Sequence, residues 1–208
     1  MMANPIRLEV FTDFVCPWCY LITPCVEKLR RNFDLDVLWV YFPLHPDTPK
    51  EGLPLTELFK GRNFDLGAAH ARLKNLMDAE GLQFNQRTHT FNSRLAQELA
   101  KAFDSVRDPL YKAYFEHAKN IGDVEVLVSI ARSVGIAENE ARAVLTERTF
   151  KPAVDADWER ARRYGITGVP SFVAGNRKLT GAHPYDVLER FMIAAGSTIS
   201  VHSDFSAD

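Results

Sequence analysis

Two cysteines, Cys16 and Cys19, are the residues of this chain whose type and spacing best suit chemistry. Only Pro17 and Trp18 lie between them, and the pair follows directly after the alternating stretch IRLEVF and its short continuation. Cysteines with this spacing can be a redox-active dithiol, half of a metal site, or two buried thiols that are close by chance. The rest of the sequence favours the first use.

A metal site is disfavoured because the chain offers too few suitable ligands. A structural zinc takes four cysteine or histidine ligands. The third cysteine, Cys25, lies nine residues after Cys16, which is roughly 13 Å along a helix, and the six histidines show no paired spacing. We therefore predict no metal, and we interpret Cys25 as a small apolar residue of the helix without a redox role.

The cysteine pair is flanked by two predicted strands and one predicted helix. IRLEVF is typical of a strand, LITPCVEKLRRNF of a helix, and LDVLWVYFPL of a second, largely apolar strand. A strand, a helix and a strand within about 40 residues make a βαβ unit with parallel strands. We expect Pro24 to kink the helix without breaking it.

This helix would place the two thiols in different surroundings. Cys16 would lie at the helix N-terminus, where unpaired backbone N–H groups and the helix dipole stabilise a thiolate. Pro17 suits the first helical position because its missing N–H costs nothing there. Cys19 would lie one turn further in and be less accessible. We predict that an exposed Cys16 forms the mixed disulfide and that Cys19 attacks it to release the product.

The middle of the chain, residues 44–151, has a helical pattern without a low-complexity linker or a repeat of fixed period. Asp65, Asn92, Asp108 and Asp123 each suit the N-cap of a helix. These helices are predicted to form one compact module.

The sheet is predicted to resume after one further helix, which begins near Pro152. VPSFVAG and RKLTG are typical of strands joined by a hairpin turn at Gly175 and Asn176, and HPYDVLERFMIAAG is typical of a last amphipathic helix. The order β-α-β, helical block, α-β-β-α predicts an α/β fold with a mixed sheet. Its domains would be an α/β domain of residues 1–43 and 152–208 and a large helical insertion of residues 44–151.

The stretch GITGVPSFV supplies a second candidate part of the site. Pro170 enters a strand after a turn that contains glycine, and a proline there cannot donate a hydrogen bond to the sheet. A cis Val169–Pro170 bond would hold an exposed backbone segment in place. Taken alone, the stretch favours a trans turn proline.

Together these motifs resemble a known family. FVCPWC after a first strand, a helical insertion, and GVPSF before a hairpin resemble the thioredoxin-like fold of the DsbA family. More narrowly, CPWCY, FPLHPDTPKEGLPL, YFEHAKNIGDVEVLVSIARSVGI and YGITGVPSFV resemble the FrnE-type branch of DsbA-like oxidoreductases, over about residues 6–195.

The resemblance implies a thiol–disulfide oxidoreductase or isomerase acting on protein or small-molecule thiols and disulfides. Cys16 would be its nucleophile and Cys19 its resolving cysteine. It also implies that Val169 and Pro170 face the cysteines, and that a substrate peptide pairs with the backbone there by strand addition. The chain departs from the family in having Pro-Trp between the cysteines where Pro-His is usual.

Two other functions stay open. Kappa-class glutathione transferases and 2-hydroxychromene-2-carboxylate isomerases share the architecture, but they have serine where this chain has Cys16. The alternative is therefore a glutathione-dependent enzyme of that kind, and glutathione is in either case a possible co-substrate; no other cofactor is implied. A peptide-binding or chaperone module with a hydrophobic groove is the further alternative.

Three residues near the pair have a structural interpretation beside a functional one. Asp13 would cap a turn or, less favoured, accept a proton during resolution. His45 follows the second strand, at the sheet edge where α/β proteins bind ligands, but a loop histidine without a role is the favoured interpretation. Trp18 would either contact a partner or pack against the fold.

Composition excludes several classes of protein. The formal net charge is −2, whereas nucleic-acid binders carry a concentrated positive surface. No apolar run approaches the roughly 18 residues of a spanning helix, and the N-terminus lacks the apolar core of a secretory signal. We expect a cytoplasmic protein without nucleic-acid or membrane partners, in which a close cysteine pair is catalytic. The sequence does not indicate an oligomeric state.

Overall fold

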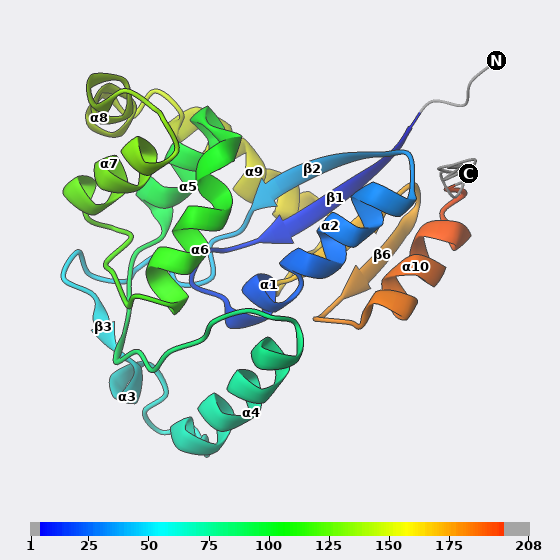
Figure 1. Cartoon of the computed structure of the whole chain (residues 1–208), viewed down its shortest axis with the longest axis horizontal. Coiled ribbons are helices and arrows are strands. Elements are labelled where there is room, and N and C mark those ends of the chain that lie inside the picture. The colour runs from blue at the N-terminus through cyan, green and yellow to red at the C-terminus, as the bar shows by residue number, and fades with distance from the viewer. Residues whose placement is uncertain (1–4, 198–208) are drawn as a thin grey trace, which may run out of the picture.

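The structure, a computed structural model, describes residues 5–197. Its central sheet has four strands in the order β2-β1-β5-β6 (Figure 1). β1 (Ile6–Thr12) pairs in parallel with β2 (Leu35–Tyr41) and antiparallel with β5 (Ser171–Ala174), and β5 pairs antiparallel with β6 (Arg177–Thr180). The prediction of a mixed sheet built from a βαβ unit and a hairpin is confirmed.

Helices cover both faces of this sheet, because its inner strands have apolar side chains on both faces. Leu8 and Val10 of β1 point to one face and pack with α2 (Thr23–Asn32) and α10 (Tyr185–Ala194). Phe11 points to the other face, where Ala161 of α9 (Lys151–Arg163) packs on it. The buried apolar residues of β1 therefore belong to a core on one side of the sheet or the other.

The middle of the chain forms a third and larger core beyond the carboxyl ends of β1 and β2 (Figure 1). Phe14, Tyr20 and Tyr41 extend from the sheet side into this core and meet Tyr111 and Phe115. Because this core includes Cys16 and Cys19, the helices after β2 help to position the cysteines. The elements concerned are α3 (Leu55–Leu58), α4 (Leu66–Ala79), α5 (Arg94–Ala102), the 3-10 turn η1 (Asp104–Val106), α6 (Arg107–Phe115), α7 (Val124–Ser133) and α8 (Glu138–Glu147), with a two-stranded ribbon of β3 (Leu53–Pro54) and β4 (His89–Thr90).

Two of the predicted helix caps form as expected and two are shifted. The side chains of Asp65 and Asp123 accept hydrogen bonds from the first turns of α4 and α7. Asn92 accepts from the N–H of Arg94 at 3.0 Å, but α5 begins one residue later than predicted. The Asp108 cap is wrong, because η1 leads directly into α6 and places Asp108 inside its first turn.

The helix after the cysteines is interrupted at Pro24 more strongly than predicted. α1 (Pro17–Leu21) ends before Ile22, and α2 begins at Thr23. Pro24 has no N–H to give to the carbonyl of Tyr20, four residues earlier. The hydroxyl of Thr23 donates to that carbonyl instead, at 2.8 Å. The break leaves Cys16 and Cys19 on a short helix of their own.

No helix in residues 5–197 has the length and apolar character needed to cross a membrane. The predicted boundaries of the insertion domain stay a prediction, and residues 1–4 and 198–208 of the predicted α/β domain lie outside the described part of the chain.

Candidate active site

The cysteine pair lies at the start of α1, just after the short loop that follows β1. Cys16 is the N-cap residue of α1 and Pro17 its first residue, as predicted from the sequence. The N–H groups of Cys19 and Tyr20 donate to the carbonyl of Cys16 at 3.1 and 3.2 Å. Both cysteines are free thiols, so the structure shows the pair in its reduced form.

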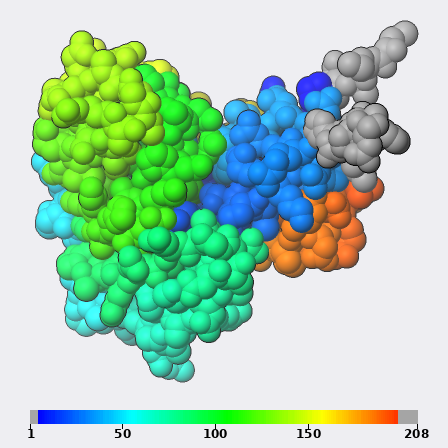
Figure 2. Space-filling model, viewed as in Figure 1, coloured from blue at the N-terminus to red at the C-terminus, as the bar shows by residue number. Residues whose placement is uncertain are grey.

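Cys16 is less exposed than we predicted. Its exposed fraction is 3%, against 0% for Cys19. The reason is that α4, from the middle of the chain, packs against α1 (Figure 2). Cys16 is nevertheless reachable from one side, because it lines a cavity of about 920 Å³, whereas Cys19 does not line it. The division between an accessible and an enclosed thiol therefore holds, although access is through a cavity.

The loop before β5 meets the cysteines from the far end of the sequence. The thiol of Cys16 donates a hydrogen bond to the carbonyl of Val169 at 3.4 Å. The Val169–Pro170 peptide bond is cis. The segment is held on both sides, since Ser171 donates to the carbonyl of Gly168 at 2.8 Å and the N–H of Gly181 donates to the carbonyl of Pro170 at 2.8 Å. The backbone beside Cys16 is thus fixed in place.

Cys19 is enclosed by groups that act on its protonation. Burial raises the pKa of the Cys19 thiol well above its usual value, and the neighbouring Cys16 raises it further, while the hydroxyl of Thr12 and the backbone of Asp13 lower it. The Thr12 hydroxyl also bonds the hydroxyl of Tyr111, at 2.5 Å. A Cys19 that keeps its proton until Cys16 has formed a disulfide would suit a resolving cysteine, because only its thiolate attacks.

The carboxylate of Asp13 serves the surrounding loops. Its oxygens accept hydrogen bonds from the N–H groups of Val15 at 3.3 Å and Leu44 at 2.9 Å. The side chain is fully buried, and this burial raises the pKa of Asp13 from 3.8 to about 6. The Asp13 backbone, and not its side chain, bonds Cys19. This arrangement favours the turn interpretation of Asp13.

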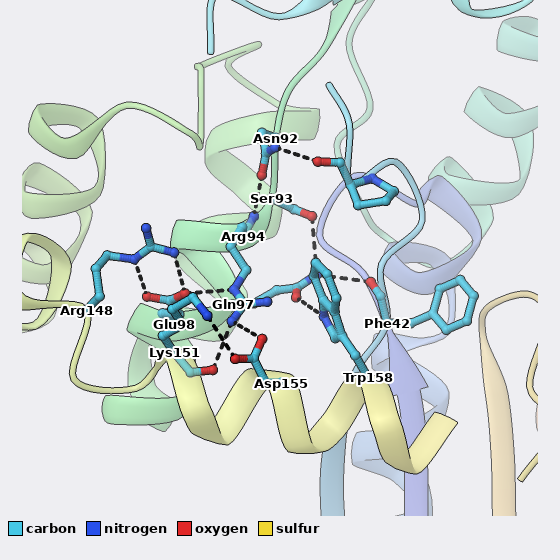
Figure 3. A network of polar contacts seen from close by, with 11 residues as sticks. Phe42, Asn92, Ser93, Arg94, Gln97, Glu98, Arg148, Lys151, Asp155 and Trp158 are labelled. Carbon is cyan, nitrogen blue, oxygen red and sulfur yellow. Dashed lines mark hydrogen bonds and ion pairs between the residues drawn. The ribbon is translucent and has the colours of Figure 1, made fainter. Parts of the chain in front are cut away.

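A network of polar side chains holds the segment that Asp13 binds (Figure 3). Gln97 of α5 donates to the carbonyl of Phe42 at 3.0 Å and accepts from the indole N–H of Trp158 at 2.9 Å. Next to it, the side chain of Glu98 has an exposed fraction of 0% and forms ion pairs with Arg94 and Arg148, each at 2.7 Å. The network joins α5, α8 and α9 to the chain just after β2.

The remaining predicted site residues lie around the cavity. Pro17, Trp18 and His45 all line it. The guanidinium of Arg72, from α4, lies 5.9 Å from the centre of the Trp18 ring. Burial lowers the pKa of His45, and the nearby Arg62 lowers it further. Cys25 lies in the separate core between α2, α10 and the sheet, away from the other two cysteines.

Comparison with known proteins identifies the family. Residues 7–192 match the DSBA-like thioredoxin domain. The chain belongs to this family.

Three relatives of this DSBA-like chain illustrate the match. A crystal structure of a probable DsbA oxidoreductase, SCO1869 from Streptomyces coelicolor, superposes with a TM-score of 0.82 at 29% identity over 92% of this chain and 90% of that one. The uncharacterized protein YwbO of Bacillus subtilis is 24% identical over 89% of this chain and 94% of its own. The cytosolic disulfide reductase DsbM of Pseudomonas aeruginosa, solved with GSH, shares the fold at a TM-score of 0.64 and 18% identity, over 90% of this chain and 98% of that one.

Several residues around the DSBA-like site were missed by sequence reasoning. Thr12 was detectable, since it ends β1 on the edge of the sheet where α/β proteins place their sites. Tyr111, Gln97 and Arg72 come from helices far along the chain, and no local pattern marks them. Within residues 5–197 no cluster of three or more metal-ligating side chains occurs.

Proposed function

We propose that this DSBA-like protein is a thiol–disulfide oxidoreductase of the FrnE type in which Cys16 and Cys19 form the redox pair. The observation that carries the proposal is the placement of the two thiols: Cys16 lines the cavity and lies 3.4 Å from the carbonyl of Val169, and Cys19 is enclosed behind it. This is the arrangement that two-step thiol–disulfide exchange requires.

The proposed cycle moves two electrons between the substrate and the pair. The thiolate of Cys16 attacks one sulfur of a substrate disulfide, and the other substrate sulfur leaves as a thiolate. Cys19 loses its proton and attacks the Sγ of Cys16, so that a Cys16–Cys19 bond forms and the second substrate thiolate leaves. The substrate is reduced and the protein oxidised. With a dithiol substrate the same steps run in reverse, and the direction in the cell stays a prediction.

Substitution of each cysteine tests this proposal. We expect Cys16→Ser to abolish exchange with a model disulfide and Cys19→Ser to accumulate a mixed disulfide that intact-mass spectrometry detects. Cys25→Ala is the matched control, because Cys25 lies in a different core, and it should leave the exchange rate unchanged. Full activity of Cys16→Ser would show that the site has been assigned to the wrong residue.

A glutathione-dependent transferase or isomerase is the second candidate. The cavity beside Cys16 supports it, as does the shared fold of DsbM, which has been solved with GSH. Calorimetric titration of glutathione into a Cys16→Ser/Cys19→Ser double variant separates the two functions. Tight, saturable binding would favour the transferase, and loss of binding together with both thiols would favour the oxidoreductase. DsbM is described as cytosolic, which is consistent with the cytoplasmic location that we predict for this chain.

A further inference from the structure

The cavity that Cys16 opens into has walls of one charge sign. Its charged lining residues are Arg72 and Arg87, and it includes no aspartate or glutamate. The chain as a whole has 27 acidic and 25 basic side chains, so the exclusion of carboxylates from the cavity is a local property. A cavity of this kind attracts an anion and repels a cation.

Neither arginine of the cavity is neutralised by the described part of the chain. Arg87 has no carboxylate within ion-pair distance among residues 5–197, and its only hydrogen bond there is from Nε to the hydroxyl of Tyr114, at 3.0 Å. Its guanidinium lies over the rings of Phe84, Tyr114 and Phe115, at 4.8 to 5.6 Å from their centres. Its terminal amino groups make no hydrogen bond within the described residues and can form a bidentate contact with a carboxylate.

Arg72 supplies a second positive charge to the cavity that Cys16 lines. It lies over the Trp18 ring, two residues along from Cys16, and it too has no carboxylate within ion-pair distance in the described residues. An anion in the cavity would therefore meet one positive charge beside Trp18 and another at Arg87.

The rest of the lining is mostly apolar. Leucines and phenylalanines of α3, of α4 and of the segment between them face the cavity, among them Leu58, Phe59 and Phe64. Thr90 also lines it, is only 1% exposed, and has a hydroxyl without a hydrogen-bond partner in the described structure. Apolar walls with a few convergent polar groups, in a volume of about 920 Å³, are characteristic of sites for small organic molecules.

We propose that this cavity binds a small-molecule disulfide with an apolar, preferably aromatic, body that carries a carboxylate. Arg87 and Arg72 are the counter-charges of the carboxylate, and Cys16 attacks the disulfide. The inference rests on the proposed function and names the substrate class of that site. One substrate disulfide and the two protein thiols give two substrate thiols and the Cys16–Cys19 disulfide, so atoms and electrons balance.

Two aromatic disulfides of opposite character test the proposal with the whole reduced protein. Dithiobis(nitrobenzoate) is anionic and dithiodipyridine is neutral, and both release a coloured thiol that stopped-flow absorbance follows. Each second-order rate constant is divided by that of 2-mercaptoethanol, a thiol without another charged group, with the same reagent, which corrects for the difference in intrinsic reactivity. We expect the normalised rate to be roughly tenfold higher for the anionic reagent, as one charge-assisted contact would give.

Charge-removing variants then assign the preference to the cavity. Arg87→Gln and Arg72→Gln should each slow the anionic reagent several-fold and leave the neutral reagent within twofold. Lys74→Gln is the matched control, since Lys74 is on the same helix as Arg72 but pairs with Asp78 at 2.7 Å and does not line the cavity. It should change neither rate.

The outcomes separate this inference from the proposed function. No preference for the anionic reagent, or an equal slowing of both reagents in the arginine variants, overturns the inference and leaves the redox pair in place. Identical kinetics in wild type and Cys16→Ser would instead overturn the proposed function, and the inference with it.

Discussion

The buried carboxylate of Asp13 makes the stability of this protein depend on pH in a way that one substitution isolates. Asp13 is fully buried, and its pKa is raised from 3.8 to about 6, chiefly by desolvation. The folded state therefore holds the Asp13 proton more tightly than the unfolded state does. The contribution of Asp13 to the free energy of unfolding should decrease as the pH rises from about 4 to about 6 and level off above about 7.

The size of this effect follows from the two pKa values. The difference between 3.8 and about 6, at about 1.4 kcal/mol per pKa unit, corresponds to about 3 kcal/mol in total. At about pH 4.5 the unfolded-state carboxyl has already lost most of its protons, so about 2 kcal/mol of this total falls between about pH 4.5 and 7.5. Asp13→Asn abolishes this ionisation. It also loses one of the two backbone hydrogen bonds, to Val15 or Leu44, because an amide has only one acceptor oxygen.

Urea unfolding of wild type and Asp13→Asn at several pH values measures the difference. Other titrating groups, His45 among them, contribute equally to both proteins and cancel. We expect the stability of wild type relative to the variant to fall by about 2 kcal/mol over the range above. Asp47→Asn, an exposed aspartate of the same loop region, is the control and should run parallel to wild type. A constant difference between wild type and Asp13→Asn would refute the argument that burial raises this pKa.

Two further predictions concern the resolving cysteine and the network behind the site. Thr12→Val removes the hydroxyl that lowers the pKa of Cys19. Less of the attacking thiolate then forms, so the mixed disulfide should live about fivefold longer, as the loss of one hydrogen bond implies. Quenched-flow alkylation with mass spectrometry measures this lifetime, and an unchanged lifetime would count against the contact between Thr12 and Cys19. Glu98→Gln leaves two arginines without their shared buried partner and should cost about 3 kcal/mol of stability. The exposed ion pair of Glu125 with Arg142 is the matched control, and Glu125→Gln should lower stability much less than Glu98→Gln, because solvent screens an exposed pair. Equal losses in calorimetry would argue against a special role for the buried pair.

Local patterns in the sequence were enough to predict the sheet and the position of the two cysteines at the start of a helix. The alternation of Leu8 and Val10, the hairpin at Gly175, and the caps Asp65 and Asp123 are all set by residues within one or two turns of chain. The same patterns misplaced the start of α6 at Asp108, because the choice between η1 and a capped helix depends on packing against α5. The ribbon of β3 and β4 was missed because each strand has only two residues, which is too short to show an alternating pattern.

What the sequence determined by itself is the local order of groups: two cysteines at the start of a helix, directly after a strand, with a proline between them in the first helical position. Tertiary structure decided what surrounds these groups. In the folded chain the carbonyl of Val169 lies 3.4 Å from the thiol of Cys16, and the Thr12–Tyr111 pair lies beside Cys19. α4 packs against α1, and Cys16 lines a cavity instead of facing bulk solvent. The physical reason is that burial and electrostatics depend on every atom nearby, whereas a helix start depends on its neighbours in the chain.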